Sequence, residues 1–98
     1  MTITKTLTGK TLAVVLEGRL DTVTAPQLDA ELKADIGGVE KLSLDFSKVE
    51  YISSAGLRVL LGAQKVMNKQ GEMVVRNTNE TIQEIFDITG FADLLTIE

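Results

Sequence analysis

Residues 49–63 read VEYISSAGLRVLLGA, and they join an apolar run to a leucine-rich one through two serines, an alanine and a glycine. Just before this stretch, KLSLDF at 41–46 alternates apolar and polar side chains, as a β-strand does. After it, apolar residues recur at helical spacing to about Gln70, and Gly71 is expected to end the helix. The stretch therefore predicts a strand, a short connection and a long helix, which is the repeating unit of an α/β fold.

The two serines of this connection have two interpretations. A serine oxygen at a helix start accepts a hydrogen bond from one of the first N–H groups, which lack partners within the helix, and contributes about 1 kcal/mol. Alternatively, a hydroxyl is held out for chemistry in the loop after a parallel strand, where α/β proteins place ligands. Gly56 costs a helix about 1 kcal/mol relative to alanine. It therefore indicates that another group approaches the backbone closely.

The N-terminal half predicts a hairpin followed by a helix. TITKTL at 2–7 and TLAVVLEG at 11–18 read as strands joined by a turn at Gly9. The second strand is nearly all apolar, so we expect it to be buried on both faces and to end at Gly18. The helix after it is expected to have its cap near Thr24, Pro26 in its first turn, and Gly37-Gly38 at its end.

The C-terminal part predicts a strand, a helix and a short last strand. EMVVR at 72–76 reads as the strand. The helix is expected to be capped by Thr78 or Asn79 and to stop at Gly90, and the last strand covers 94–97. The order is thus β-β-α-β-α-β-α-β. It predicts an α/β fold with a mixed, mostly parallel sheet, right-handed crossovers and an antiparallel first strand.

Size and composition predict one domain over residues 1–98. A chain of this length forms a single core, and 44% hydrophobic residues are enough to build it. The alternation at 41–46 leaves Ser43 and Asp45 on one face of its strand, so helices are expected mainly on the other face. The long helix carries more apolar residues than one stripe needs. Val59 and Val66 are therefore expected in the core, with an exposed partner-binding patch as the alternative.

The composition also excludes several functions. Cysteine and histidine are absent, which removes disulfides, thiolate or imidazole metal sites, cysteine nucleophiles and Ser-His triads. Catalysis by carboxylates, Lys48 or Ser54 has no motif behind it, so we expect neither an enzyme nor a cofactor. A net charge of −4 without basic runs argues against nucleic acid. With no signal peptide or apolar span, a cytoplasmic location is expected, without membrane insertion.

A family resemblance appears at two places in the chain. VVLEGRLDTVTAPQL contains Gly-x-Leu-Asp after a strand, and ISSAGL is similar to Asp-Ser-[Ser/Thr/Ala]-Gly-Leu at the start of the second helix. Together these patterns resemble the STAS domain of bacterial anti-sigma factor antagonists. The likeness runs from about Leu12 to Ile97 and implies the α/β fold described above.

The resemblance implies a phosphorylation switch at Ser54. In that family the serine before the variable residue and Gly-Leu is phosphorylated by the anti-sigma factor, which is a serine kinase. Here Ala55 is the variable residue, and Ser53 stands where the family usually has aspartate. A phosphate adds about −1.5 to −2 charges, which a helix N-terminus accepts without unfolding. The unphosphorylated chain would then bind the kinase and so regulate sigma-factor-dependent transcription, with a phosphatase as a second partner.

The resemblance also places the partner-binding surface. It assigns Asp21 and Thr22, in the loop after the second strand, to the surface that contacts the kinase, together with Ser53, Ser54, Gly56 and Arg58. Asp21 could equally order only the turn before the first helix. Arg58, four residues past Ser54, could pair with a phosphate or be a solvated charge.

One alternative function remains open on the same fold. Stand-alone STAS domains also resemble accessory subunits of bacterial ABC-type transporters, which dock on the ATPase without being phosphorylated. The replacement of the usual aspartate by Ser53 keeps this alternative open. In either case we expect a monomer or a weak homodimer.

Overall fold

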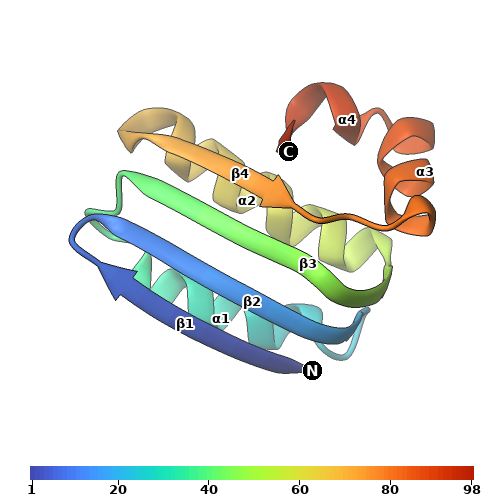
Figure 1. Ribbon diagram of the computed structural model, residues 1–98, viewed down its shortest axis with the longest axis horizontal. Coiled ribbons are helices and arrows are strands. Elements are labelled where there is room, and N and C mark those ends of the chain that lie inside the picture. The colour runs from blue at the N-terminus through green and yellow to red at the C-terminus, as the bar shows by residue number, and fades with distance from the viewer.

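The computed structural model describes all of residues 1–98 and shows one mixed sheet of five strands with helices against it (Figure 1). The strands lie in the order β1-β2-β3-β4-β5, with β1 antiparallel to β2 and the other neighbours parallel. The elements in chain order are β1 (Thr2–Thr8), β2 (Thr11–Leu20), α1 (Ala25–Asp35), β3 (Lys41–Ile52), α2 (Ser54–Gln70), β4 (Glu72–Arg76), α3 (Glu80–Thr89), α4 (Phe91–Leu94) and β5 (Thr96–Ile97). The predicted α/β class and strand directions are confirmed.

The core lies between the sheet and the helices. α1 and α2 lie side by side behind the sheet in Figure 1, and α3 and α4 follow at one end of it. The largest fully buried side chains come from the strands and from all three longer helices: Leu12, Leu16, Leu20, Leu28, Leu42, Leu44, Phe46, Ile52, Leu60, Met67, Met73 and Phe86. Burial of this apolar surface provides the main driving force for folding.

The other face of the sheet carries no helix over β2 and β3 (Figure 1), which confirms the expectation of one-sided packing. The prediction that β2 is buried on both faces is wrong. Leu12, Val14 and Leu16 are buried, whereas Ala13 and Val15 on the opposite face are only half-buried. Small apolar side chains tolerate this partial exposure, so an apolar run alone does not reveal how many faces are covered.

Two strands are longer than the sequence predicts. β2 continues past Gly18 to Leu20, and β3 continues past residue 46 to Ile52. Gly18 has a φ of +111° and lies where the register between β2 and β3 shifts. Glycine adopts this backbone without the penalty that a Cβ would bring, so it marks an irregularity within the strand rather than its end.

The helix boundaries follow their capping residues. Asn79 caps α3, because its Oδ1 accepts a hydrogen bond from the N–H of Ile82 at 2.8 Å. Gly90 ends α3 in the left-handed conformation, as expected. The expected last strand over 94–97 is reduced to Thr96–Ile97, because the chain forms one further turn, α4, directly after Gly90. No helix has the length and apolar character needed to cross a membrane.

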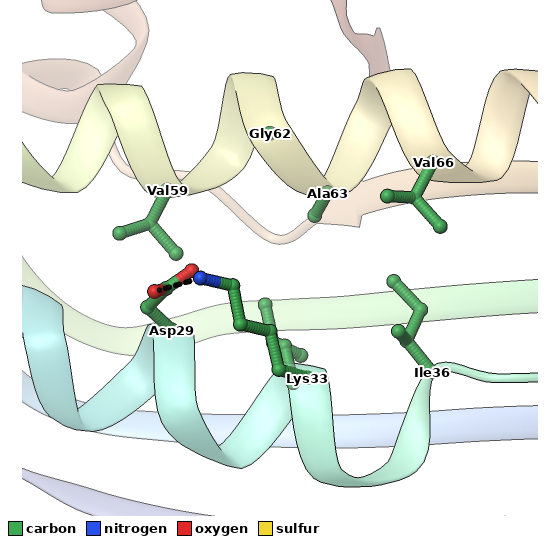
Figure 2. Close-up of a pocket in the computed structure, with 8 residues that line it drawn as sticks. Asp29, Lys33, Ile36, Val59, Gly62, Ala63 and Val66 are labelled. Atoms are coloured by element: carbon green, nitrogen blue, oxygen red, sulfur yellow. Dashed lines mark ion pairs between the residues drawn. The ribbon is translucent and has the colours of Figure 1, made fainter.

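The long helix α2 has the predicted ends, but the side of it that carries Val59 and Val66 is less buried than predicted. It begins at Ser54 and ends before Gly71, as predicted. Val59 is half-buried and Val66 is exposed, so the prediction that both belong to the core is wrong for Val66. Both valines point toward α1 and line a groove between the two helices (Figure 2).

Gly56 brings the first turn of α2 into close contact with the ends of β2 and β3. A Cβ at this position would lie 2.7 Å from Cγ of Leu20 and 2.8 Å from Cγ1 of Ile52. Neither atom is the free end of a flexible side chain, so an added methyl group would force the helix away from the sheet.

We therefore expect opposite effects from replacing two glycines of α2 by alanine. Gly62 has open space around its Cα, so Gly62→Ala should raise the free energy of unfolding by up to about 1 kcal/mol through helix propensity. Gly56→Ala should lower it by about 1–2 kcal/mol, because overpacking outweighs that gain. Urea unfolding of both variants measures the two changes. Equal stabilisation by the two alanines would contradict the close packing of Gly56.

Candidate functional site

The candidate site lies at the carboxyl ends of β2 and β3. These strands are parallel neighbours, and Leu20 pairs with Ile52 in their register. The N–H of Ser53 donates to the carbonyl oxygen of Leu20 at 2.8 Å, directly after both strands end. The loop that begins at Asp21 and the start of α2 are therefore held side by side, at the edge of the sheet where α/β proteins place ligands.

The structure assigns different positions to the two serines. Ser53 is the N-cap of α2 in an extended conformation, and its Oγ accepts from the N–H of Gly56 at 3.4 Å. Ser54 is the first residue of the helix, and it is exposed. The capping interpretation thus applies to Ser53, and the hydroxyl held out to solvent belongs to Ser54.

Asp21 orders the turn before α1. Its Oδ1 accepts from the N–H groups of Val23 and Thr24, both at 3.0 Å. The Thr24 hydroxyl accepts from the N–H of Asp21 at 2.9 Å and donates to the carbonyl of Arg19 at 2.7 Å. Thr24 occupies the N-cap position as predicted, but its own side chain makes no cap bond to the helix. The carboxylate of Asp21 binds the N–H groups that precede α1 instead.

These contacts hold Asp21 in its charged form. The N–H of Thr24 is the largest influence, and the N–H of Val23, the Thr24 hydroxyl and the nearby charge of Arg19 act in the same direction. Together they lower the pKa of Asp21 below its usual value of 3.8, because each stabilises the carboxylate more than the neutral acid. Arg19 contributes through Nε, which lies 3.9 Å from Oδ2 of Asp21.

Of the remaining predicted site residues, two lie on the surface and one lies in the interior. Thr22 and Arg58 are exposed. Gly56 is buried, and the group that approaches its backbone is the domain's own core at Leu20 and Ile52. Gly56 therefore shapes the site from beneath and is not part of its exposed surface.

Three further residues of this surface are absent from the sequence prediction. Arg19 and Tyr51 face each other across the β2–β3 pair, with the guanidinium carbon 4.8 Å from the ring centroid. This distance is within the range of a cation–π contact. Val23, between Asp21 and Thr24, is 84% exposed. The register of the two strands would reveal the Arg19–Tyr51 pair, but a single sequence does not define that register.

The surface therefore combines exposed hydroxyls with an apolar side chain, an aromatic ring and paired charges. Nowhere in residues 1–98 do three or more aspartate or glutamate side chains gather closely enough to hold a metal ion. Exposed apolar and aromatic side chains beside charges are typical of protein-binding surfaces.

Comparison with known proteins identifies the family. The sequence model of the STAS domain family matches residues 2–98 of this chain. The chain is 39% identical to BtrV of Bordetella bronchiseptica over 88 residues, which cover 88% of this chain and 76% of that protein. It is 32% identical to the anti-sigma-B factor antagonist of Bacillus subtilis over 87 residues, which cover 88% of this chain and 80% of that protein. The chain belongs to the STAS domain family.

Solved structures share the fold. The anti-sigma factor antagonist SpoIIAA in its unphosphorylated form matches with a TM-score of 0.78 at 21% identity, over 99% of this chain and 87% of that one. The phosphorylated form of SpoIIAA from Bacillus matches with a TM-score of 0.77 at 21% identity, over 99% of this chain and 91% of that one. The two forms of SpoIIAA therefore resemble this chain equally well.

The turn at Asp21 leads to a prediction about acid stability. We expect the carboxyl group of Asp21 to titrate below 3.8, because the folded chain binds its proton less tightly than the unfolded chain does. The resulting contribution to stability is complete above the unfolded pKa and is lost as the pH falls through the lower folded pKa.

Side-chain carboxyl NMR shifts give the titration directly. Urea unfolding between about pH 6 and about pH 3 should show that Asp21→Asn loses this part of the pH dependence. A folded pKa at or above 3.8 would contradict the hydrogen bonds of the turn.

Proposed function

We propose that this chain is an anti-sigma factor antagonist that binds an anti-sigma factor serine kinase and is released when Ser54 is phosphorylated. It acts as a binding protein and regulates sigma-factor-dependent transcription. The observation that carries the proposal is the position of Ser54, exposed at the first residue of α2 beside the Asp21 loop. A kinase can reach this hydroxyl, and a partner bound there covers it.

The start of α2 favours an added anion. Helix N-termini present unpaired N–H groups and the positive end of the helix dipole. The first turn of α2 carries no acidic residue that would already neutralise this end, whereas α3 has Glu80 in its first turn. A phosphate on Ser54 would add about −1.5 to −2 charges there, with Arg58 one turn further along.

The same charge would oppose a bound partner. A surface packed against Ser54, Val23 and Tyr51 would meet additional volume and the energy of desolvating a phosphate. A loss of only about 1.4 kcal/mol of binding free energy already weakens binding tenfold. The match to both forms of SpoIIAA supports a switch that alters binding and leaves the fold intact, since a fold of this type is found with and without phosphate.

The presence of Ser53 in place of the family's aspartate changes the surroundings of the phosphate but leaves Ser54 as the residue that accepts it. The family's usual aspartate would place a carboxylate beside the phosphorylated serine. With Ser53 there, the added phosphate has no carboxylate as its immediate neighbour in the chain and is repelled less. The capping bond to the N–H of Gly56 is retained, because a serine oxygen accepts it as an aspartate oxygen would.

Incubation with the cognate kinase and ATP tests the proposal. We expect mass spectrometry to find one phosphoryl group on the wild type and on Ser53→Ala, and none on Ser54→Ala. The reason is that Ser54 is exposed at this helix end, whereas Ser53 is half-buried and its Oγ caps the helix. Isothermal titration should find that Ser54→Glu binds the kinase at least about tenfold more weakly than Ser54→Ala.

Other outcomes would contradict the proposal. Phosphate at another residue, or equal kinase binding by the alanine and glutamate variants, would exclude a switch at Ser54. Purification of the chain from its own cells together with a transporter ATPase, without any kinase, would favour the accessory-subunit function.

A further inference from the structure

Three cations form a row on α2 that no carboxylate of the chain neutralises. Six of the ten lysine and arginine side chains lie within 4.0 Å of a carboxylate. Of the other four, Arg58, Lys65 and Lys69 are on α2 and exposed. Spacings of seven and four residues place them on one face of a helix. We call Arg58, Lys65 and Lys69 the basic row.

An apolar groove runs beside the basic row. Val59 and Val66 of α2 point toward α1, and Ile36 at the end of α1 points back toward Val66 (Figure 2). The groove has a volume of about 200 Å³. The ion pair between Asp29 and Lys33, at 2.9 Å, also lines the groove and faces Val59 from α1 (Figure 2). Exposed apolar surface flanked by charges is typical of a contact site for another protein.

The opposite pattern occurs on α3. Glu80, Glu84 and Asp87 are exposed, share one helix face through spacings of four and three residues, and form no ion pair. We call these three residues the acidic row. Ile88 lies directly beside them and is 84% exposed. This side chain is therefore accessible to another molecule.

The two helices match in charge and in the placement of their apolar side chains. On α2, Val66 follows Lys65 by one residue, and on α3, Ile88 follows Asp87 by one residue. On both helices the apolar side chain therefore lies about 100° from the charged row, in the same rotational direction about the helix axis. No ion pair joins α2 to α3 within one chain. Both surfaces are thus available to a second copy.

We propose that two copies of this chain associate by packing α3 of one copy against α2 of the other. The acidic row faces the basic row, and Ile88 enters the groove lined by Val59 and Val66. The contact joins different surfaces of the two copies. The unphosphorylated chain forms this contact without a kinase, so it can hold or fail independently of the proposed function.

The size and chemistry of the contact predict weak association. Two helices of 17 and 10 residues form a small contact beside the roughly 1,200–2,000 Å² that stable complexes bury. Exposed charge pairs contribute mainly specificity and are screened by salt. We therefore expect a dissociation constant of about 0.1–1 mM at low ionic strength and weaker association in salt.

Charge reversal on each helix tests the contact. Sedimentation velocity up to about 1 mM protein, in about 20 mM salt, should show the wild type self-associating and salt reversing it. Lys65→Glu with Lys69→Glu, and separately Glu84→Lys with Asp87→Lys, should each be monomeric, because both rows then carry the same sign. An equimolar mixture of the two double variants should associate again, because opposite rows meet across the two proteins.

Matched controls separate this effect from net charge. Lys10→Glu with Lys41→Glu changes the net charge from −4 to −8, as the α2 variant does, but at exposed residues outside both rows. Glu40→Lys with Glu72→Lys changes it from −4 to 0, as the α3 variant does. Both controls should self-associate as the wild type does. Circular dichroism confirms that every variant is folded.

Several outcomes would overturn the proposal. A wild type that stays monomeric under these conditions has no such contact. Association that survives both double reversals would place the contact elsewhere, for example on the edge strand β1. Binding of the monomeric wild type to phosphatidylglycerol vesicles through Lys65 and Lys69 would assign the basic row to a membrane surface instead.

Discussion

The close fit of Gly56 against Leu20 and Ile52 is the constraint on which the site depends. It brings the first turn of α2 onto the ends of two parallel strands, at a distance that no side chain would permit. The hydrogen bond from Ser53 to Leu20 then holds the start of the helix beside the Asp21 loop. The exposed hydroxyl of Ser54 is thus carried on a rigid junction of three elements, and its position does not depend on a flexible loop.

The structural roles and the proposed site of modification fall on different neighbouring groups at this junction. Ser53 caps the helix and Asp21 orders the adjacent turn, so both polar side chains satisfy backbone N–H groups. Ser54 is left exposed in the first turn of a helix that lacks acidic residues there. A charge added to Ser54 would therefore alter the surface that a partner meets while the helix end stabilises it. Modification would control association without requiring the domain to unfold.

Local patterns in the sequence predict the order of the strands and of the three longer helices, the mostly parallel sheet and the start of α2, because alternation, helical spacing and glycines act over a few residues. They do not predict the extra turn α4. Features that depend on tertiary placement are not predicted. The half-exposed face of β2, the continuation past Gly18 and the exposure of Val66 all depend on what packs alongside. The Arg19–Tyr51 contact requires the strand register, and the purpose of Gly56 requires the positions of Leu20 and Ile52. The family resemblance implies Ser54 as the phosphorylation site, whereas only the structure separates its exposed position from the capping position of Ser53.

Amide hydrogen exchange, compared between the unmodified chain and the chain phosphorylated at Ser54, tests the central claim most directly. The N–H groups of α2 report whether its first turns stay formed when the phosphate is added. If the helix end accepts the charge, protection from Leu57 to Met67 will be equal or higher in the phosphorylated chain. Loss of protection over the first two turns of α2 would mean that phosphate unfolds the junction, and the account of a switch on a rigid surface would be wrong.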